Sequence, residues 1–226
     1  MNTLKINFSQ QPLSLKEMAV RSIKNAIFEG QLEPETLYSD LHLANTLGIS
    51  KTPVREALIE LASNELLVHE PRKGFKIRSL CEKDIMDLFE YRMVIELSII
   101  NMVVPNITDE GQHQLGEILA ENKNKLQQNS EYNQSIKADR LFHLKLSELS
   151  NNPFFGKAIK QVRELCDLAG TWSLMNAERK FEAQNEHEKI LEMIMSRDVE
   201  GAKEKMKEHL SITCSKIIEN LQRSQK

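Results

Sequence analysis

The chain has 226 residues, of which 40% are hydrophobic and 28% are charged, a composition typical of a folded protein with a hydrophobic core. Its 30 Lys and Arg against 33 Asp and Glu give a net charge of −3, which excludes binding of nucleic acid by bulk positive charge. A local basic surface is not excluded. The longest apolar stretch, Met93 to Val104, is too short for a bilayer span, so no membrane partner is predicted. No signal peptide is found, and Cys81, Cys166 and Cys214 are far apart, which predicts a cytoplasmic protein without disulfides.

Three helices are predicted in the first part of the chain. The first begins after Ser14, because Ser14 and Glu17 have the spacing of a capping box. The second begins near Ser39 and ends in a tight turn at Gly48–Ser50, after which the third begins around Lys51–Pro53. Apolar residues recur at helical spacing in all three. The residues predicted to be buried are Leu15, Ala19, Ile23, Ala26, Ile27, Leu43, Ala44, Leu47, Val54, Ala57, Leu58, Leu61 and Ala62.

Two short strands are predicted at Leu66–Glu70 and Phe75–Arg78, on either side of Pro71–Gly74. Apolar and basic residues alternate in the second strand, which is typical of a half-buried strand. Beyond it the helical period continues to the C-terminus. The sequence therefore predicts a mainly α protein, with a winged helix-turn-helix over residues 1–80 and an all-helical antiparallel bundle over residues 81–226.

A helix, a glycine turn, a second helix and a hairpin with a basic tip form the pattern of a winged helix-turn-helix that binds DNA. The start of the third helix presents four polar residues opposite its buried face: Ser50, Lys51, Thr52 and Arg55. The hairpin tip adds Arg72, Lys73 and Gly74. A helix N-terminus attracts phosphates and Arg55 has the fork that a guanine edge accepts, whereas Lys51 supplies a point charge. The alternative is a solvated helix face beside a hairpin that only caps the module.

A second constellation lies in the helical region. Asp139 and His143 are four residues apart and so share one helix face. His187 and His209 are equally far from the break at Ser196–Val199, so an antiparallel helix pair folded there places them at the same height. Three imidazoles and a carboxylate predict a site for a divalent transition metal, with Zn²⁺ preferred and Ni²⁺ or Mn²⁺ as alternatives. The competing interpretation of these four residues is ordinary surface or core histidines and one capping aspartate. His42, His69 and His113 are interpreted as ordinary histidines.

The segment Leu43–Leu58 resembles the DNA-binding signature of GntR-type bacterial transcription regulators, and Lys73–Phe75 resembles their wing. This resemblance covers roughly residues 14–79. It implies binding to double-stranded DNA. The contact residues that it implies are Ser50, Lys51, Thr52, Arg55, Lys73 and Gly74.

Residues 82–222 resemble the all-helical ligand-binding domain of the FadR branch of these regulators, the FCD domain. The matching segments are Tyr91–Glu96, Asp139–His143 followed by Asn152, Glu186–Leu191, and Asp198–Leu210. In metal-binding members of that family an Asp and three His are the ligands. The resemblance therefore implies a ligand role for Asp139, His143, His187 and His209.

The same resemblance implies that Arg92 binds the carboxylate of a small organic acid beside the metal, with Asn152 as a second effector-binding residue. Each has a structural alternative. Arg92 and Glu96 are four residues apart and can form an ion pair on one helix, and Asn152 can cap the helix that Pro153 begins.

The sequence thus predicts a homodimeric transcription regulator, a repressor and not an enzyme, that binds a palindromic operator and senses a small organic acid at a metal site. One alternative is a metal-dependent hydrolase, which lacks an obvious spare base because Glu186 is expected to point away from its neighbour His187. The other is a purely structural metal in a dimerisation domain. Because imidazoles bind metals in the neutral form, metal affinity is expected to fall as the pH drops through about 6.5.

Overall fold

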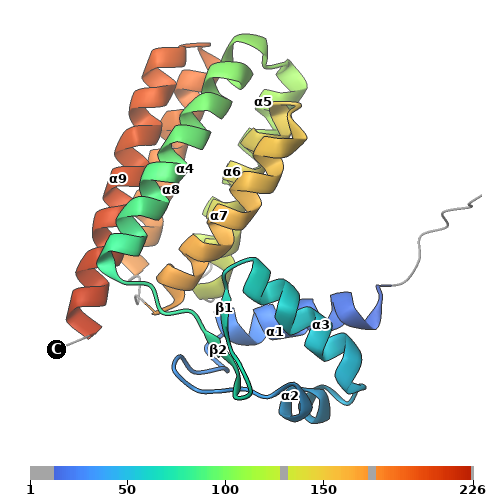
Figure 1. Cartoon of the computed structure of the whole chain (residues 1–226). Coiled ribbons are helices and arrows are strands. Elements are labelled where there is room, and N and C mark those ends of the chain that lie inside the picture. The colour runs from blue at the N-terminus through green and yellow to red at the C-terminus, as the bar shows by residue number, and fades with distance from the viewer. Residues whose placement is uncertain (1–12, 128–131, 173–176, 225–226) are drawn as a thin grey trace, which may run out of the picture. The chain divides into compact units, whose positions relative to one another are not determined.

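The computed structural model describes residues 13–127, 132–172 and 177–224. The chain divides into two compact units, Met1–Ser79 and Leu80–Lys226. Three helices and a two-stranded hairpin form the first unit, and helices form the described part of the second (Figure 1). The predicted fold class, mainly α with a small β wing, is confirmed.

The helices of the N-terminal unit are α1 (Leu15–Phe28), α2 (Asp40–Leu47) and α3 (Lys51–Ser63). Reciprocal hydrogen bonds begin α1, since Ser14 N–H donates to Glu17 Oε2 at 2.8 Å and Glu17 N–H donates to Ser14 Oγ at 3.2 Å. Gly48 ends α2 in the left-handed conformation, with φ of 67°, which an L side chain adopts only with strain. Gly48 therefore allows the tight turn between α2 and α3.

The apolar faces of α1 and α2 pack on α3. Most residues predicted to form this core are buried, but Leu15 is 50% exposed, so its predicted burial is wrong. Leu15 lies one turn before Ala19 on the same face, and the buried stripe ends before it reaches the first turn of α1. Three further members of the predicted core are only half-buried: Ala26, Leu47 and Ala62.

The hairpin pairs β1 (Leu67–Glu70) with β2 (Gly74–Ile77) in antiparallel register, with Leu67 opposite Ile77. The first strand begins one residue later than predicted, and the second begins and ends one residue earlier. At the tip Lys73 N–H donates to the Glu70 carbonyl at 3.1 Å, and Arg72 has a φ of 68°. A proline followed by a residue with positive φ is the geometry of a type II turn, which turns the basic tip outward.

Gly74 is fixed by packing inside the N-terminal unit. Tyr38 forms a bridge with Phe75, in which the Tyr38 N–H donates to the Phe75 carbonyl at 2.7 Å and the Phe75 N–H donates back at 3.0 Å. Gly74 has a φ of 135°, and a Cβ at this position would lie 2.6 Å from the Tyr38 carbonyl oxygen. The wing therefore needs glycine here to lie against the chain at Tyr38.

Gly74→Ala is expected to lower the free energy of unfolding of the N-terminal unit by about 2 kcal/mol or more, because the new Cβ adds backbone strain and a steric clash. Gly116 in α5 (Asp109–Gln127) is the matched control. Nothing lies within 4 Å of a Cβ built there, so Gly116→Ala is expected to stabilise the helix by about 0.5–1 kcal/mol. Calorimetric unfolding of both variants checks the pair, and equal effects would contradict the assignment.

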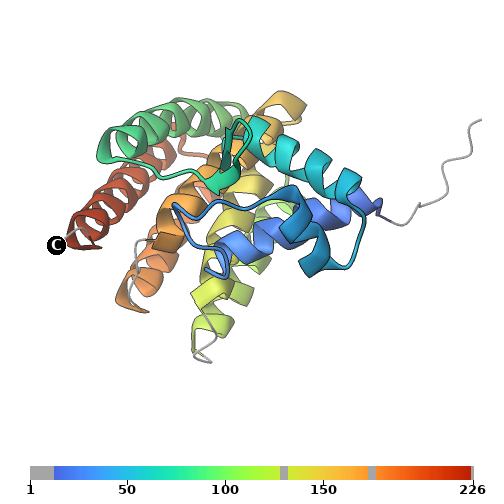
Figure 2. The same ribbon diagram turned by 60° about the horizontal axis from the view of Figure 1, so that its bottom comes forward.

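The second unit is a bundle of six α-helices in the described ranges, in which a short 3₁₀ turn, Val104–Asn106, separates α4 from α5. Besides α5, its helices are α4 (Glu82–Val103), α6 (Tyr132–Leu149), α7 (Pro153–Trp172), α8 (Ala177–Met195) and α9 (Val199–Ser224). Helix α4 packs on α9, α7 and α6, while α5 packs on α6 and α8. Helices α4 and α9 lie side by side in both views (Figure 1, Figure 2).

The break between α8 and α9 falls where the sequence predicted it. Met195 ends α8, Arg197 has a φ of 59°, and Val199 begins α9. Asp198 Oδ1 accepts the Gly201 N–H at 2.9 Å and so caps α9. The two helices then pack together along their length, which brings the His187 and His209 regions to the same level. Among the described residues, the helices lack a stretch with the length and apolarity that a membrane span requires.

Candidate metal centre and nucleic-acid interface

The first turn of α3 carries the residues predicted to contact DNA. Ser50 is the exposed N-cap of α3, and its hydroxyl makes no capping hydrogen bond. Lys51, Thr52 and Arg55 are exposed on the same turn. Asp40 of α2 holds the two cations, with Lys51 Nζ at 3.2 Å and Arg55 Nη1 at 3.6 Å from its carboxylate oxygens. Both are surface contacts that DNA phosphates can replace.

The wing tip presents two cations. Arg72 and Lys73 are exposed, and Lys73 Nζ lies 3.4 Å from Glu70 Oε2. Gly74 is half-buried against Tyr38, so its place in the sequence pattern is explained by the packing of the wing. Exposed basic side chains therefore lie at both places predicted from the sequence, the start of α3 and the tip of the wing.

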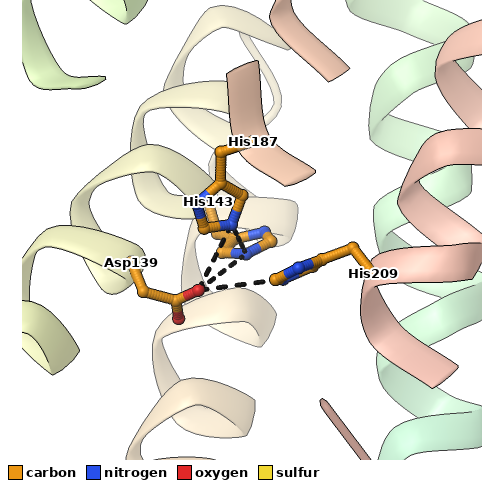
Figure 3. Close-up of side chains that lie close together, drawn as sticks. All are labelled: Asp139, His143, His187 and His209. Atoms are coloured by element: carbon orange, nitrogen blue, oxygen red, sulfur yellow. Dashed lines mark hydrogen bonds and ion pairs between the residues drawn. The ribbon is translucent and has the colours of Figure 1, made fainter. Parts of the chain in front are cut away.

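Four side chains from three helices meet inside the bundle. Asp139 and His143 come from α6, His187 from α8 and His209 from α9. Figure 3 shows the carboxylate of Asp139 directed at the three imidazoles. Asp139 Oδ1 lies 3.2 Å from Nε2 of His187 and 3.7 Å from Nε2 of His143 and of His209. One ligand atom from each residue lies within 4.8 Å of all the others, so the four can share one ion.

Two glutamates orient these imidazoles from behind. His143 Nδ1 lies 2.5 Å from Glu96 Oε2, and His209 Nδ1 lies 2.7 Å from Glu186 Oε2. A carboxylate on the far nitrogen fixes the tautomer and raises the basicity of a ligating histidine. The sequence offered Glu186 no shared role with its neighbour His187. In the structure its carboxylate contacts His209 on the facing helix and so takes part in the site.

Three buried arginines balance the carboxylates. Arg92 Nε donates to Glu96 Oε1 at 2.6 Å, and Arg179 donates to both oxygens of Glu186 at 2.5 and 2.8 Å. Arg163 Nη2 donates to Asp139 Oδ2. This leaves Asp139 Oδ1 on the side of the histidines. Because a buried charge needs a partner, each arginine holds one carboxylate of the site in place.

The residues fit a metal ion on an observation independent of the family resemblance. His209 Nε2 is buried and has no hydrogen-bond partner within the described ranges, although it faces the cluster. An unpaired buried acceptor is rare unless something else satisfies it. The Asp139 side chain is 23% exposed, whereas the histidines are buried, so the site is reached from the Asp139 side. Three imidazole nitrogens and a carboxylate oxygen suit Zn²⁺, Ni²⁺ or Mn²⁺.

The protonation states suit metal binding at neutral pH. Burial, together with the nearby histidines, lowers the pKa of His209 to about 3, and burial lowers the pKa of His187. Burial opposes ionisation of Asp139, but the Arg163 guanidinium and a hydrogen bond from His187 outweigh it and hold the pKa of that carboxyl well below its ordinary value. Neutral imidazoles and an ionised carboxylate are the ligating forms.

This arrangement changes the pH dependence expected from the sequence. Three exposed imidazoles of ordinary pKa would weaken metal binding roughly fiftyfold between pH 7.5 and pH 6.0. A lowered pKa keeps His187 and His209 neutral across this range, so protons compete less. Zn²⁺ affinity is therefore expected to fall less than about fivefold. Chelator competition at the two pH values measures it, and a fiftyfold fall would contradict the buried site.

The two predicted effector-binding residues have different surroundings. Arg92 is fully buried and touches the site, because its Nη2 lies 2.9 Å from His143 Nε2. It also forms the helical ion pair with Glu96 that the sequence offered as an alternative. Asn152 Oδ1 accepts the Phe154 N–H at 3.1 Å, which is the capping role. The structure therefore brings Arg92, but not Asn152, into hydrogen-bond contact with the metal centre.

Sequence reasoning missed four contributors: Glu96 as the partner of His143, Glu186 as the partner of His209, Arg163 as the partner of Asp139, and Arg179 as the partner of Glu186. Their contacts with the site join different helices or distant turns. No local spacing reports such contacts, because they depend on how each helix is rotated about its axis. The one signal was charge type, since arginines inside apolar helix faces require buried partners.

Two families match the chain. Residues 15–77 match bacterial regulatory proteins of the gntR family, and residues 87–211 match the FCD domain. A winged helix-turn-helix joined to this helical domain defines a DNA-binding transcription regulator. The chain belongs to the GntR family of bacterial regulators and carries an FCD domain. Its relatives are named transcription regulators, so it is not an enzyme, and the hydrolase alternative is not favoured.

The chain is 26% identical to the regulator YdhC of Bacillus subtilis, over 86% of this chain and 87% of the relative. It is 29% identical to the regulator McbR of Escherichia coli (84% and 87%) and 23% identical to the repressor GlaR of Escherichia coli (84% and 90%). The structure of Escherichia coli McbR/YncC has the same fold, with a TM-score of 0.81 at 24% identity over 93% of this chain and 100% of that chain. The metal-free FCD domain of TM0439 is 25% identical, with a TM-score of 0.53 over 65% of this chain and 99% of that chain.

Proposed function

We propose that this regulator binds a divalent metal at Asp139, His143, His187 and His209, and that a small organic acid bound beside the metal changes its affinity for DNA. The observation that most directly supports this proposal is the convergence of three buried imidazoles and one carboxylate. His209 Nε2, one of the converging atoms, has no hydrogen-bond partner among the described residues. The description of TM0439 as a metal-free FCD domain supports a metal in this kind of domain. When bound, the ion would supply a positive charge that attracts the acid.

Arg92 is the proposed partner of the acid's carboxylate. A guanidinium suits bidentate carboxylate recognition, and Arg92 contacts the ligand histidine His143 directly. Its Nη1 is buried without a hydrogen-bond partner in the described part of the chain. A small acid is favoured over a large ligand because the whole arginine is buried.

In the N-terminal unit we propose that the start of α3 enters the major groove of DNA with Ser50, Lys51, Thr52 and Arg55. The wing tip then binds a neighbouring stretch of the DNA phosphate backbone through Arg72 and Lys73. The recognition-helix start is exposed and basic, which fits this geometry. Repression is the proposed mode of action, as in the relative GlaR. A protein that binds chromosomal DNA in a bacterium works in the cytoplasm.

We propose a homodimer formed through α4. Its outer face carries exposed apolar side chains centred on Val94, which is 63% exposed. Met86 and Met102, both exposed, lie eight residues before and after Val94, so two antiparallel copies of α4 would bring Met86 of one copy to the level of Met102 of the other. A groove of about 540 Å³ beside Met102 is also lined by Lys203 and Lys207 of α9.

The charges on this face are complementary to a second copy. In the antiparallel arrangement the groove lysines would lie near Asp87 and Glu90 of the partner subunit, which precede Val94 on α4. Apolar contacts at the centre and ion pairs at the rim are typical of protein interfaces. A dimer of this kind presents two recognition helices and matches a palindromic operator.

Val94→Glu is expected to convert the dimer to a monomer at micromolar concentration, because it buries two like charges at the two-fold axis. Light scattering after gel filtration gives the mass. Met195→Glu at the end of α8 is the control, since Met195 is also exposed but lies outside this face, and it is expected to remain dimeric. A dimeric Val94→Glu protein would contradict the α4 interface.

A thermal-shift screen of small carboxylic acids tests the proposed function. The protein is compared after Zn²⁺ loading and after treatment with a chelator. An acid that raises the melting temperature only of the metal-loaded protein, and then shifts its affinity for DNA, supports the sensor. Stabilisation by metal with no response to any acid would instead support the alternative, a structural metal.

A further inference from the structure

This inference rests on the proposed metal site and concerns the hydrogen bonds of Arg92. The side chain is fully buried, with Nε donating to Glu96 Oε1 at 2.6 Å. Its Nη2 lies 2.9 Å from His143 Nε2, and its Nη1 has no partner among the residues described. The buried Arg92 guanidinium therefore places Nη2 on a candidate ligand atom, while its Nη1 remains unpaired among the described residues.

The contacts of the His143 ring fix its tautomer. Arginine carries only donors, so His143 Nε2 must accept the Arg92 hydrogen bond through its lone pair. Nδ1 then carries the proton and donates it to Glu96 at 2.5 Å. Nε2 is also the atom that faces the cluster, 3.3 Å from His187 Nε2 and 3.7 Å from Asp139 Oδ1. The lone pair that a metal needs from His143 is the one that Arg92 occupies.

We propose that Arg92 competes with the metal for His143 and is the element that couples metal to acid. A single lone pair cannot serve both a guanidinium and an ion, so ligation by His143 requires Arg92 to leave Nε2. The released guanidinium of the buried Arg92 then has two donors, Nη1 and Nη2, without hydrogen-bond partners, which is unfavourable away from water. The forked carboxylate of a small acid satisfies both. Metal and acid therefore favour each other's binding, and Arg92 weakens the binding of metal alone.

The other oriented histidine supplies an internal comparison. Arg179, Glu186 and His209 repeat the order of Arg92, Glu96 and His143, with the carboxylate between guanidinium and imidazole. Arg179 donates to Glu186 and to the Thr213 hydroxyl at 2.9 Å, while His209 Nε2 has no hydrogen-bond partner in the described ranges. Both arginines support a glutamate, and Arg92 in addition contacts the ligand nitrogen of its histidine. Replacing Arg179 therefore removes the support of a glutamate, whereas replacing Arg92 removes that support and also the contact with a ligand nitrogen.

The test measures the Zn²⁺ affinity of the full chain by competition with a chromogenic chelator, in buffer free of carboxylates. The proteins are wild type, Arg92→Met, Arg92→Lys and Arg179→Met, with circular dichroism as the check on folding. Arg92→Met is expected to bind Zn²⁺ roughly tenfold or more tightly than wild type, because a charge-assisted hydrogen bond no longer competes. Arg179→Met is expected to bind no more tightly than wild type. If Arg92→Met does not fold, Arg92→Lys decides, since its shorter side chain keeps the charge near Glu96 but withdraws from His143.

A second titration adds millimolar acetate as the simplest carboxylate. Acetate is expected to raise the Zn²⁺ affinity of wild type and of Arg179→Met several-fold and to have no such effect on Arg92→Met. Variants of Arg92 that bind Zn²⁺ as weakly as wild type, or more weakly, would overturn the competition while leaving the proposed function intact. Failure of wild type and of every variant to bind Zn²⁺ would overturn the proposed function as well.

Discussion

Replacing His187 with alanine is expected to lower the Zn²⁺ affinity by more than about a hundredfold, since even the loss of a residue that only orients a ligand lowers metal affinity tenfold to a hundredfold. His187 is buried, and its Nε2 lies within 3.3 Å of both Asp139 Oδ1 and His143 Nε2. Its Nδ1 has no partner among the described residues, so the imidazole is held mainly by what its Nε2 faces. Chelator competition measures the loss.

The matched control is His113→Ala, because His113 is an exposed histidine of α5 that pairs with Glu117 on its own helix, away from the cluster. It is expected to bind Zn²⁺ like wild type. Circular dichroism should show that His187→Ala keeps its helices, with some loss of stability from the buried truncation. An unchanged affinity in His187→Ala would contradict the ligand assignment, and a protein that unfolds would favour a structural metal over a sensor.

Replacing Arg55 with alanine is expected to weaken operator binding about tenfold to a hundredfold and to relax the preference for one base pair, as for the loss of a bidentate contact with guanine. Arg55 is exposed on the first turns of α3, and its ion pair with Asp40 is long at 3.6 Å. The side chain is therefore free to change partner. Binding to an operator fragment at several salt concentrations gives both the affinity and the salt dependence.

Arg21→Ala is the control for charge, because Arg21 is an exposed arginine of α1, outside the recognition helix and the wing. It removes the same charge and is expected to leave operator affinity within about threefold of wild type. If Arg55→Ala binds the operator normally, or if both variants weaken binding equally, α3 is not the recognition helix.

The sequence predicted most of the fold because helix ends and apolar periodicity are local properties. Ser14 with Glu17, Gly48 and the break before Val199 each fix a boundary through their own backbone geometry. The apolar face of α1 was predicted one turn too long, since burial of Leu15 depends on where the neighbouring helix ends. Propensity gives no information on that.

The convergence of the four predicted ligands was also within reach of the sequence. Asp139 and His143 share a helix face, and the symmetric spacing of His187 and His209 about one turn needs only an antiparallel helix pair. The contacts of the glutamates and arginines with these ligands could not be predicted from the sequence. Whether Glu186 meets His209, and whether Arg92 reaches His143 across the bundle, depends on helix rotation and crossing, which are settled by the packing of the whole core.

Elemental analysis of the purified protein, before and after a chelator, tests the central claim most directly. We predict about one Zn, Ni or Mn ion per chain before treatment, its loss with the chelator, and its absence from the His187→Ala protein prepared in parallel. A wild-type protein that carries no such metal, and takes none up when Zn²⁺ is supplied, would contradict the metal centre. The winged helix-turn-helix would then stand without the proposed sensor.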